Sequence, residues 1–237
     1  MPHDNPAAAD RYNDGDYLAN NATWHAEDSP WKALQIEKIL VKNALPFDTL
    51  CEVGCGAGEI LQELSKKEPF KHAKFTGYEV SEDAFGICSQ KANASVSYEL
   101  KDILAEDVFY DVALCIDVFE HVEDYMGFIR KLSGKARYKV FHIPLDLSVS
   151  TVARGTLSGY RQSIGHLHYF TAATARDTLK DCGLKIVDSM FTPKFADYPS
   201  KTLGSIVANI PRHILWRISP ELMATWLGGC SLLVIAE

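Results

Sequence analysis

Residues 49–61 read TLCEVGCGAGEIL, and this stretch decides the fold. A short apolar run ends at Val53, three glycines alternate over 54–58, and apolar residues at helical spacing follow. Glycine lets a chain turn tightly and lets its backbone approach a ligand closely. A helix behind such a loop offers free backbone N–H groups to that ligand. The stretch therefore predicts a strand, a ligand-binding glycine loop and a helix.

Strand and helix patterns alternate on both sides of this unit. A helix is expected from Ser29-Pro30, because serine is a good N-cap and proline suits the first helical turn. The alternation predicts a parallel sheet with helices on both faces, an α/β fold. The further strands are expected at 73–79, 96–100, 111–116, 138–143, 184–191 and 231–236.

Two longer segments interrupt this alternation. Residues 144–170 are rich in Gly, Ser and His, and residues 192–230 are longer than an ordinary hairpin loop. Within the second segment, Pro211 and Pro220 are expected to separate short amphipathic helices. These helices are predicted at 206–210, 214–218 and 222–227.

Composition and charge exclude several classes of protein. The chain has 237 residues, of which 47% are hydrophobic and 23% charged, so it is not a disordered protein. The net charge of −7 and the absence of a Lys/Arg cluster argue against a nucleic-acid partner. The N-terminal residues lack the pattern of a signal peptide, and the apolar tract 222–236 is shorter than the roughly 18 residues of a spanning helix. We therefore expect a soluble, cytoplasmic protein.

The six cysteines do not indicate a metal. Cys51 and Cys55 are four positions apart, and no Cys/His set has the spacing of a zinc site. A free cysteine in apolar surroundings behaves as a small hydrophobe. No metal site is expected.

The glycine loop differs from the dinucleotide fingerprint GxGxxG, because its glycines are spaced GxGxG and Glu59 follows. Glu52 and Glu59 would both oppose a doubly charged pyrophosphate, but they suit a ligand that carries an ammonium and a sulfonium. Glu79 follows Gly58 by 21 positions, at the end of the next expected strand. An acid there can hold ribose hydroxyls.

These motifs together resemble the class I S-adenosylmethionine-dependent methyltransferases of the small-molecule type. The resemblance covers about residues 49–189 and the last strand. It implies a Rossmann-like sheet of seven strands, mostly parallel, with strand seven antiparallel. The motifs that carry it are CEVGCGAG (51–58), GYEVS (77–81), KDI (101–103), CIDVFEHVED (115–124), GHLHYFT (165–171) and CGLKIVD (182–188).

The resemblance implies S-adenosylmethionine as cofactor, S-adenosylhomocysteine as product, and a set of binding residues. In this interpretation Glu79 holds the ribose, Val80 lies against adenine and Asp102 lies beside the adenine amino group. Glu52 acts indirectly on the amino group of the ligand, and Lys32 pairs with its carboxylate. The full set is Lys32, Glu52, Gly54, Cys55, Gly56, Gly58, Glu79, Val80, Asp102, Ile103, Ile116, Asp117 and His121.

Methyl transfer is an in-line displacement in which the protein mainly positions donor and acceptor. A base is needed only for a poorly acidic hydroxyl or a protonated amine. The candidates are His142, His166 and His168, since histidine is the natural base near neutral pH. For each of them a structural, hydrogen-bonded histidine is the alternative.

The acceptor is predicted to be a small or carrier-linked molecule methylated on oxygen, such as a sugar, a lipid-linked precursor or a secondary metabolite. The family branch that methylates amino groups of nucleobases has an Asn/Asp-Pro-Pro-aromatic run, and here residues 116–119 read IDVF. Alternatives are a non-catalytic S-adenosylmethionine-binding module and an NAD(P)-dependent oxidoreductase. Peripheral membrane contact through 206–227 and a homodimer stay open.

The predicted organisation is an N-terminal lid or helix over 1–48 and a cofactor-binding domain over 49–237. The acceptor pocket is expected to be built from the lid and from the inserts 144–170 and 192–230.

Overall fold

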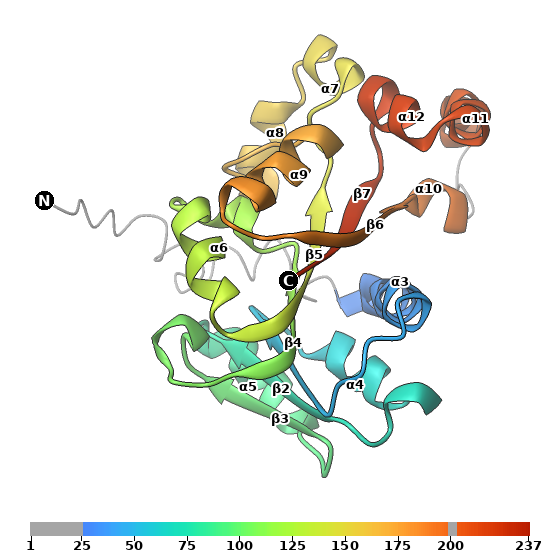
Figure 1. Ribbon diagram of the computed structural model, residues 1–237. Coiled ribbons are helices and arrows are strands. Elements are labelled where there is room, and N and C mark those ends of the chain that lie inside the picture. Colours follow the sequence, from blue (N-terminus) through green and yellow to red (C-terminus); the bar gives the residue numbers. More distant parts are fainter. Residues whose placement is uncertain (1–25, 199–202) are drawn as a thin grey trace, which may run out of the picture. The chain divides into compact units, whose positions relative to one another are not determined.

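The computed structural model describes residues 26–198 and 203–237, whose strands form one seven-stranded sheet of order β3-β2-β1-β4-β5-β7-β6 (Figure 1). Both β2 and β4 run parallel to β1, β3 runs parallel to β2, and β7 runs antiparallel to β6. This confirms the predicted Rossmann-like sheet with an antiparallel last strand. The strands are β1 (Thr49–Val53), β2 (Lys74–Glu79), β3 (Val96–Leu100), β4 (Tyr110–Ile116), β5 (Ala136–Pro144), β6 (Ile186–Thr192) and β7 (Ser231–Ala236).

Several helices begin at the caps that the sequence supplies. Ser81 accepts a hydrogen bond from the Ala84 amide, and Thr171 forms a capping box with Thr174. The α-helices are α3 (Ser29–Lys42), α4 (Glu59–Ser65), α5 (Glu82–Cys88), α6 (Tyr125–Ser133), α7 (Val149–Ala153), α8 (Leu157–Ser163), α9 (Ala172–Asp181), α10 (Lys194–Asp197), α11 (Leu203–Ile218) and α12 (Pro220–Leu227). The 3-10 turns are η1 (Ala26–Asp28), η2 (Glu68–Phe70), η3 (Ser89–Lys91), η4 (Ile103–Ala105) and η5 (Phe119–His121).

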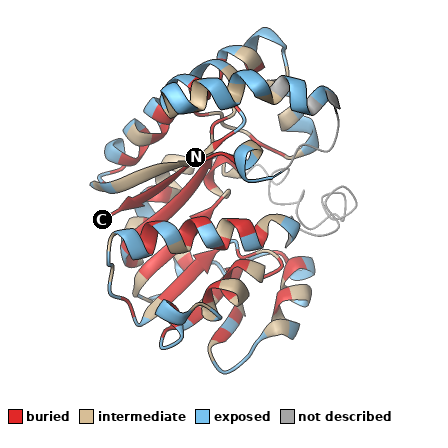
Figure 2. Cartoon of the chain, turned by 90° about the vertical axis from the view of Figure 1, so that its right-hand side faces the viewer, coloured by how far each residue is buried: buried red, intermediate tan, exposed pale blue. Residues whose placement is uncertain are grey.

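The described residues divide into two compact units. The first unit runs to Val118 and also includes Lys131–Val140. Its strands are buried, as Figure 2 shows, because apolar residues of α3 and α4 pack in its core. Of the predicted lid over 1–48, residues 1–25 lie outside the described residues, and most of the described remainder is α3.

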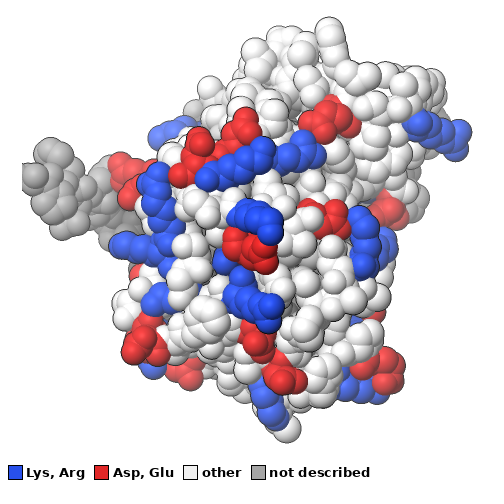
Figure 3. Space-filling model, viewed as in Figure 1, with Lys and Arg blue, Asp and Glu red and all other residues white. Residues whose placement is uncertain are grey.

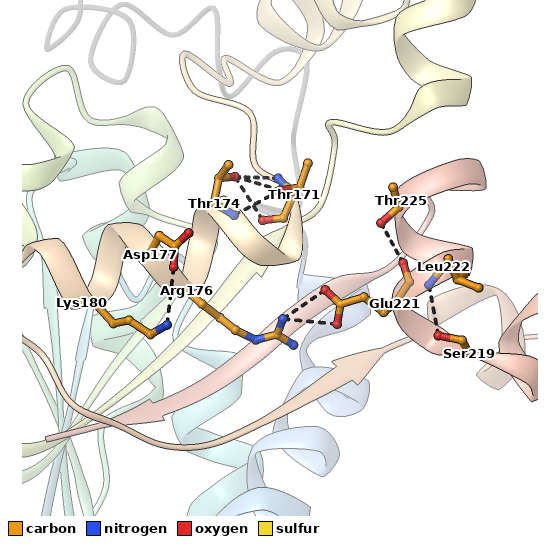
Figure 4. A network of polar contacts seen from close by, with 9 residues as sticks. All are labelled: Thr171, Thr174, Arg176, Asp177, Lys180, Ser219, Glu221, Leu222 and Thr225. Atoms are coloured by element: carbon orange, nitrogen blue, oxygen red, sulfur yellow. Dashed lines mark hydrogen bonds and ion pairs between the residues drawn. The ribbon is translucent and has the colours of Figure 1, made fainter.

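The second unit comprises Phe119–Arg130 and Phe141–Glu237. Phe119 lies at its centre, with its ring centroid 6.0 Å from that of Phe141 and 5.3 Å from that of Phe170. At the surface, Arg176 of α9 donates to both carboxylate oxygens of Glu221 of α12, at 3.1 and 3.2 Å (Figure 4). This exposed ion pair adds little stability, but it links two helices that are far apart in sequence.

Residues 203–218 form one continuous helix, so the prediction that Pro211 divides this segment is wrong. A proline inside a helix removes one hydrogen bond, here the bond to the carbonyl of Val207. Val207 belongs to an exposed face of α11, where water can replace the missing donor. Pro220 does separate two helices, as expected, and it is itself the first residue of α12, with Ser219 as the N-cap. The insert 144–170 contains the two short helices α7 and α8.

None of the described helices is long and apolar enough to cross a membrane. Of the described side chains on α11, five large apolar ones are exposed along one face. Contact of 206–227 with a membrane surface stays a prediction. On the face in Figure 3, basic and acidic side chains are interspersed. Among the described side chains of α11, the exposed large apolar ones are Ile206, Val207, Ile210, Ile214 and Ile218.

Candidate functional site

The glycine loop follows β1 in the first unit and turns into α4. Gly54, Gly56 and Gly58 all have positive φ, at 63°, 53° and 78°. The Gly58 amide donates to the Cys55 carbonyl at 2.9 Å, and the Cys55 amide donates to the carbonyl of Tyr78 at 3.1 Å. The loop is thus a tight turn fixed to the end of β2.

Glu79 holds this loop with its carboxylate. The Gly56 amide donates to Oε2 at 2.8 Å, and the amides of Val80 and Ser81 donate to Oε1 at 2.8 and 2.9 Å. Hydrogen bonds to an ionised carboxylate are strong, and such a group has about four acceptor positions. Described residues fill three of them, two on Oε1 and one on Oε2, so Oε2 accepts one bond fewer than Oε1.

Tyr98 of β3 supports the loop through its hydroxyl group, and no motif in the sequence indicated this role. Its hydroxyl donates to the Gly58 carbonyl at 2.8 Å and accepts from Gln62 at 3.0 Å. Burial raises the pKa of the Tyr98 phenol, which keeps the hydroxyl protonated and able to donate. A side chain at Gly58 or Gly77 would meet the Tyr98 ring at 2.6 Å. Both glycines are therefore required by packing.

Glu59 is paired in this structure. Lys91 Nζ lies 2.5 Å from Glu59 Oε1 and donates to the Ala57 carbonyl at 2.7 Å. The lysine offsets the charge of Glu59, so this acid opposes a pyrophosphate less than the sequence alone suggests.

Glu52 of β1 is buried, and its Oε2 has no hydrogen-bond partner among the described residues. Burial raises the pKa of Glu52 well above its usual range, Lys32 lowers it, and Glu79 raises it further. A buried carboxyl of this kind is destabilising when ionised unless a cation lies beside it.

Replacing Glu52 by glutamine is expected to raise the Tm at pH 8 by about 3 °C. The folded protein binds the Glu52 proton more tightly than the unfolded chain, in which this glutamate has its ordinary pKa of 4.5. The parent therefore loses stability as the pH rises from that value towards the folded pKa, and glutamine does not titrate. Thermal unfolding between pH 5 and 8 checks this.

The matched control for this experiment is Glu82→Gln, because Glu82 is an exposed acid in the first turn of α5. Its Tm difference from the parent should stay small at every pH. If the Glu52→Gln gain is the same at pH 5 and pH 8, ionisation of Glu52 is not its cause.

Lys32 and Asp117 form an ion pair, with Lys32 Nζ 2.7 Å from Asp117 Oδ2. Asp117 follows β4 with a φ of 54°, an uncommon conformation for a residue with a side chain. Ile116, the residue before it, is buried at the end of the strand. The pair places a lysine beside the carboxyl end of β4, the edge at which open α/β sheets bind ligands.

Two further predicted site residues lie directly after strands β2 and β3. Val80 is 62% exposed directly after β2, an unusual position for an apolar side chain. Asp102 is exposed after β3, and its Oδ1 accepts from the Leu104 amide at 2.9 Å. Asp102 therefore caps η4 and keeps a second oxygen for another donor. Ile103, the next residue, is buried.

The three candidate bases lie in the second unit, in different surroundings. His142 is buried, and its Nε2 lies 2.9 Å from the hydroxyl of Thr192. His168 Nε2 lies 3.0 Å from the Val122 carbonyl, and its ring centroid is 4.4 Å from that of Tyr125. Such hydrogen bonds and ring contacts are those that structural histidines make.

His166 differs from these two because a carboxylate orients it. Its Nδ1 lies 2.5 Å from Asp146 Oδ2. His121, which follows β4 in η5, lies beside it: the two ring centroids are 4.8 Å apart in an edge-to-face arrangement. His121 Nδ1 lies 3.2 Å from the Gly165 carbonyl. The structure thus brings together two predicted site residues from distant motifs.

Comparison with known proteins identifies the family. Residues 23–189 match the methyltransferase-domain family. The ubiquinone biosynthesis O-methyltransferase of Rickettsia typhi is 30% identical over 199 residues, which cover 80% of this chain and 77% of that protein. A protein of the same name from Hydrogenovibrio crunogenus is 32% identical over 127 residues, 47% of this chain and 49% of its own.

Solved structures agree on the fold. Magnesium protoporphyrin IX methyltransferase from Synechocystis PCC 6803, solved with bound S-adenosylhomocysteine, has a TM-score of 0.59 at 19% identity, covering 87% of this chain and 82% of its own. The plantazolicin methyltransferase has a TM-score of 0.60 at 17% identity. The match covers 97% of this chain and 93% of that protein. The oxidoreductase alternative is therefore wrong, and the chain belongs to the methyltransferase-domain family as an S-adenosylmethionine-dependent class I methyltransferase.

Proposed function

We propose that this enzyme methylates an oxygen atom of a small or carrier-linked acceptor. The observation that carries the proposal is the 30% identity to the ubiquinone biosynthesis O-methyltransferase of Rickettsia typhi over 80% of this chain. The sequence after β4 supports it, because Asp117 and Val118 stand where an amino-methylating nucleobase enzyme has its two prolines. A sugar, a lipid-linked precursor or a secondary metabolite fits this class.

The residues of the first unit fit the cofactor. The tight glycine loop gives backbone access, and Glu79 keeps one acceptor position on Oε2 for a ribose hydroxyl. The exposed Val80 offers an apolar contact for adenine, and the second oxygen of Asp102 offers an acceptor for its amino group. Cys55 is buried within the loop and contributes through its backbone.

Charge at this site also suits the ligand. Bound S-adenosylmethionine supplies a methyl group on a positively charged sulfonium, with an ammonium and a carboxylate at its other end. Glu52 is a buried carboxyl with an unpartnered oxygen, and a nearby ammonium would favour its ionised form. Lys32 is the proposed partner of the carboxylate, and Asp117 holds it in place.

The test is an acceptor screen with methyl-labelled S-adenosylmethionine. Substituted catechols, sugar nucleotides and polyprenyl-linked sugars form the panel, and mass spectrometry locates the added methyl group. The expected product is a methyl ether, stable to mild base. A product methylated on nitrogen or carbon would overturn the oxygen assignment. Cofactor binding without turnover, on any acceptor or on cell extract, would favour the non-catalytic binding module.

A further inference from the structure

A compact group of potential metal ligands lies in the second unit, formed by Glu120, His121 and His166. One ligand atom from each of the three lies within 4.8 Å of the others. Glu120 is 1% exposed and His166 is 6% exposed, so the group is largely withdrawn from solvent. Two imidazoles and one carboxylate are the donor set of many transition-metal sites.

The hydrogen bonds of both histidines prepare them for a metal. A carbonyl oxygen only accepts, so His121 Nδ1 must donate to the Gly165 carbonyl at 3.2 Å. His166 Nδ1 likewise donates to Asp146 Oδ2 at 2.5 Å. In the neutral ring this leaves the lone pair on Nε2. Histidines that ligate metals show this pattern, in which the other ring nitrogen donates to a carboxylate or carbonyl.

The backbone holds the two segments of the group together. The amides of Leu167 and His168 both donate to the Glu120 carbonyl, at 2.9 and 3.1 Å. His168 Nε2 also bonds the Val122 carbonyl at 3.0 Å. Residues 165–168 are therefore fixed against η5, and the ligands do not depend on a loose loop. A site held in this way loses little entropy when it binds an ion.

We propose that Glu120, His121 and His166 bind a divalent transition-metal ion, with Zn²⁺ as the first choice, and that Asp146 and the Gly165 carbonyl orient the two histidines. Ligand atoms around tetrahedral zinc lie about 3.4 Å apart, so binding draws the three side chains inward by about 1 Å. Three protein ligands leave a coordination position open, as in catalytic zinc sites. This inference does not depend on the acceptor under Proposed function.

The first experiment measures metal directly on the full chain. Protein stripped with a chelator is titrated with Zn²⁺, and with Co²⁺ as a spectroscopic substitute. One equivalent should bind, the Co²⁺ complex should absorb in the visible range, and saturating Zn²⁺ should raise the Tm by about 5–10 °C. All six cysteines are free and buried, so thiolate-to-cobalt charge transfer would indicate binding at cysteine and overturn the proposal.

Variants locate the site. His166→Ala and Glu120→Gln should lose stoichiometric binding, and Asp146→Asn should weaken it about tenfold, because it changes only the partner of His166. His72→Ala is the control, since His72 is a largely exposed histidine of the first unit. Binding of S-adenosylhomocysteine and circular dichroism report whether each variant is folded.

The competing explanation is a group held by hydrogen bonds and a Glu–His ion pair alone. In that case Zn²⁺ leaves the Tm of the parent unchanged, and His166→Ala lowers the Tm equally with and without Zn²⁺. Either that result, or equal metal binding by the parent and by His166→Ala, would refute the proposed metal site.

Discussion

Replacing Glu79 by alanine is expected to lower the affinity for S-adenosylhomocysteine at least about 100-fold. The change removes the proposed ribose acceptor and leaves the Gly56, Val80 and Ser81 amides without their carboxylate. An unsatisfied buried donor costs about 1–3 kcal/mol, so the free energy of unfolding should fall by about 2–4 kcal/mol. Calorimetric titration measures the affinity, and thermal unfolding measures the stability.

Two variants separate cofactor recognition from loop support. Glu82→Gln removes a nearby exposed acid in the first turn of α5, and it should bind like the parent. Glu79→Gln keeps the shape but has one acceptor oxygen, so it should retain more stability than Glu79→Ala and still bind weakly. A folded Glu79→Ala protein that binds S-adenosylhomocysteine as the parent does would refute the role of Glu79. NAD should give no binding heat with any of them.

The parts of the site that the sequence predicted are those that local rules determine. Residues 49–61 indicated strand, loop and helix because glycine spacing and helical periodicity are properties of neighbouring residues. The position of Glu79 followed from the length of one strand–helix–strand unit. Tyr98 and Lys91 were missed because each acts on the loop from a distant part of the chain, where ordinary strand and helix patterns give no functional signal.

The sequence did not predict the metal-ligand group of Glu120, His121 and His166, because its members also come from distant parts of the chain. Rules for metal sites rely on ligands a few residues apart, as in CxxC or HxxxH, and these ligands come from two separate segments. The fold brings them together through backbone hydrogen bonds to Glu120, which no side-chain pattern encodes. The continuity of α11 was also missed, because whether a helix tolerates Pro211 depends on solvent access at Val207 rather than on the proline alone.

Replacing Gly58 by alanine is the second large effect expected. Gly58 has a φ of 78°, and an added Cβ would lie 2.6 Å from two atoms of the Tyr98 side chain. Tyr98 is buried, and its hydroxyl accepts a hydrogen bond from Gln62, so the ring has little freedom to move away. Left-handed strain and overpacking should together lower the free energy of unfolding by about 2–4 kcal/mol. Binding of S-adenosylhomocysteine should weaken at least about tenfold, because the loop must shift.

Gly86→Ala provides a control in which the free energy of unfolding is expected to rise rather than fall. Gly86 lies in α5 with nothing within 4 Å of an added Cβ, so alanine there should stabilise the protein by about 0.5–1 kcal/mol. Gly54→Ala provides a graded case, since its Cβ meets only the methyls of Val118, the nearer at 3.2 Å. The expected order of stability is Gly86→Ala, parent, Gly54→Ala, Gly58→Ala. If Gly58→Ala is as stable as Gly54→Ala, steric contact with the Tyr98 ring is not what excludes a side chain at position 58. The backbone conformation alone would then explain the requirement for glycine.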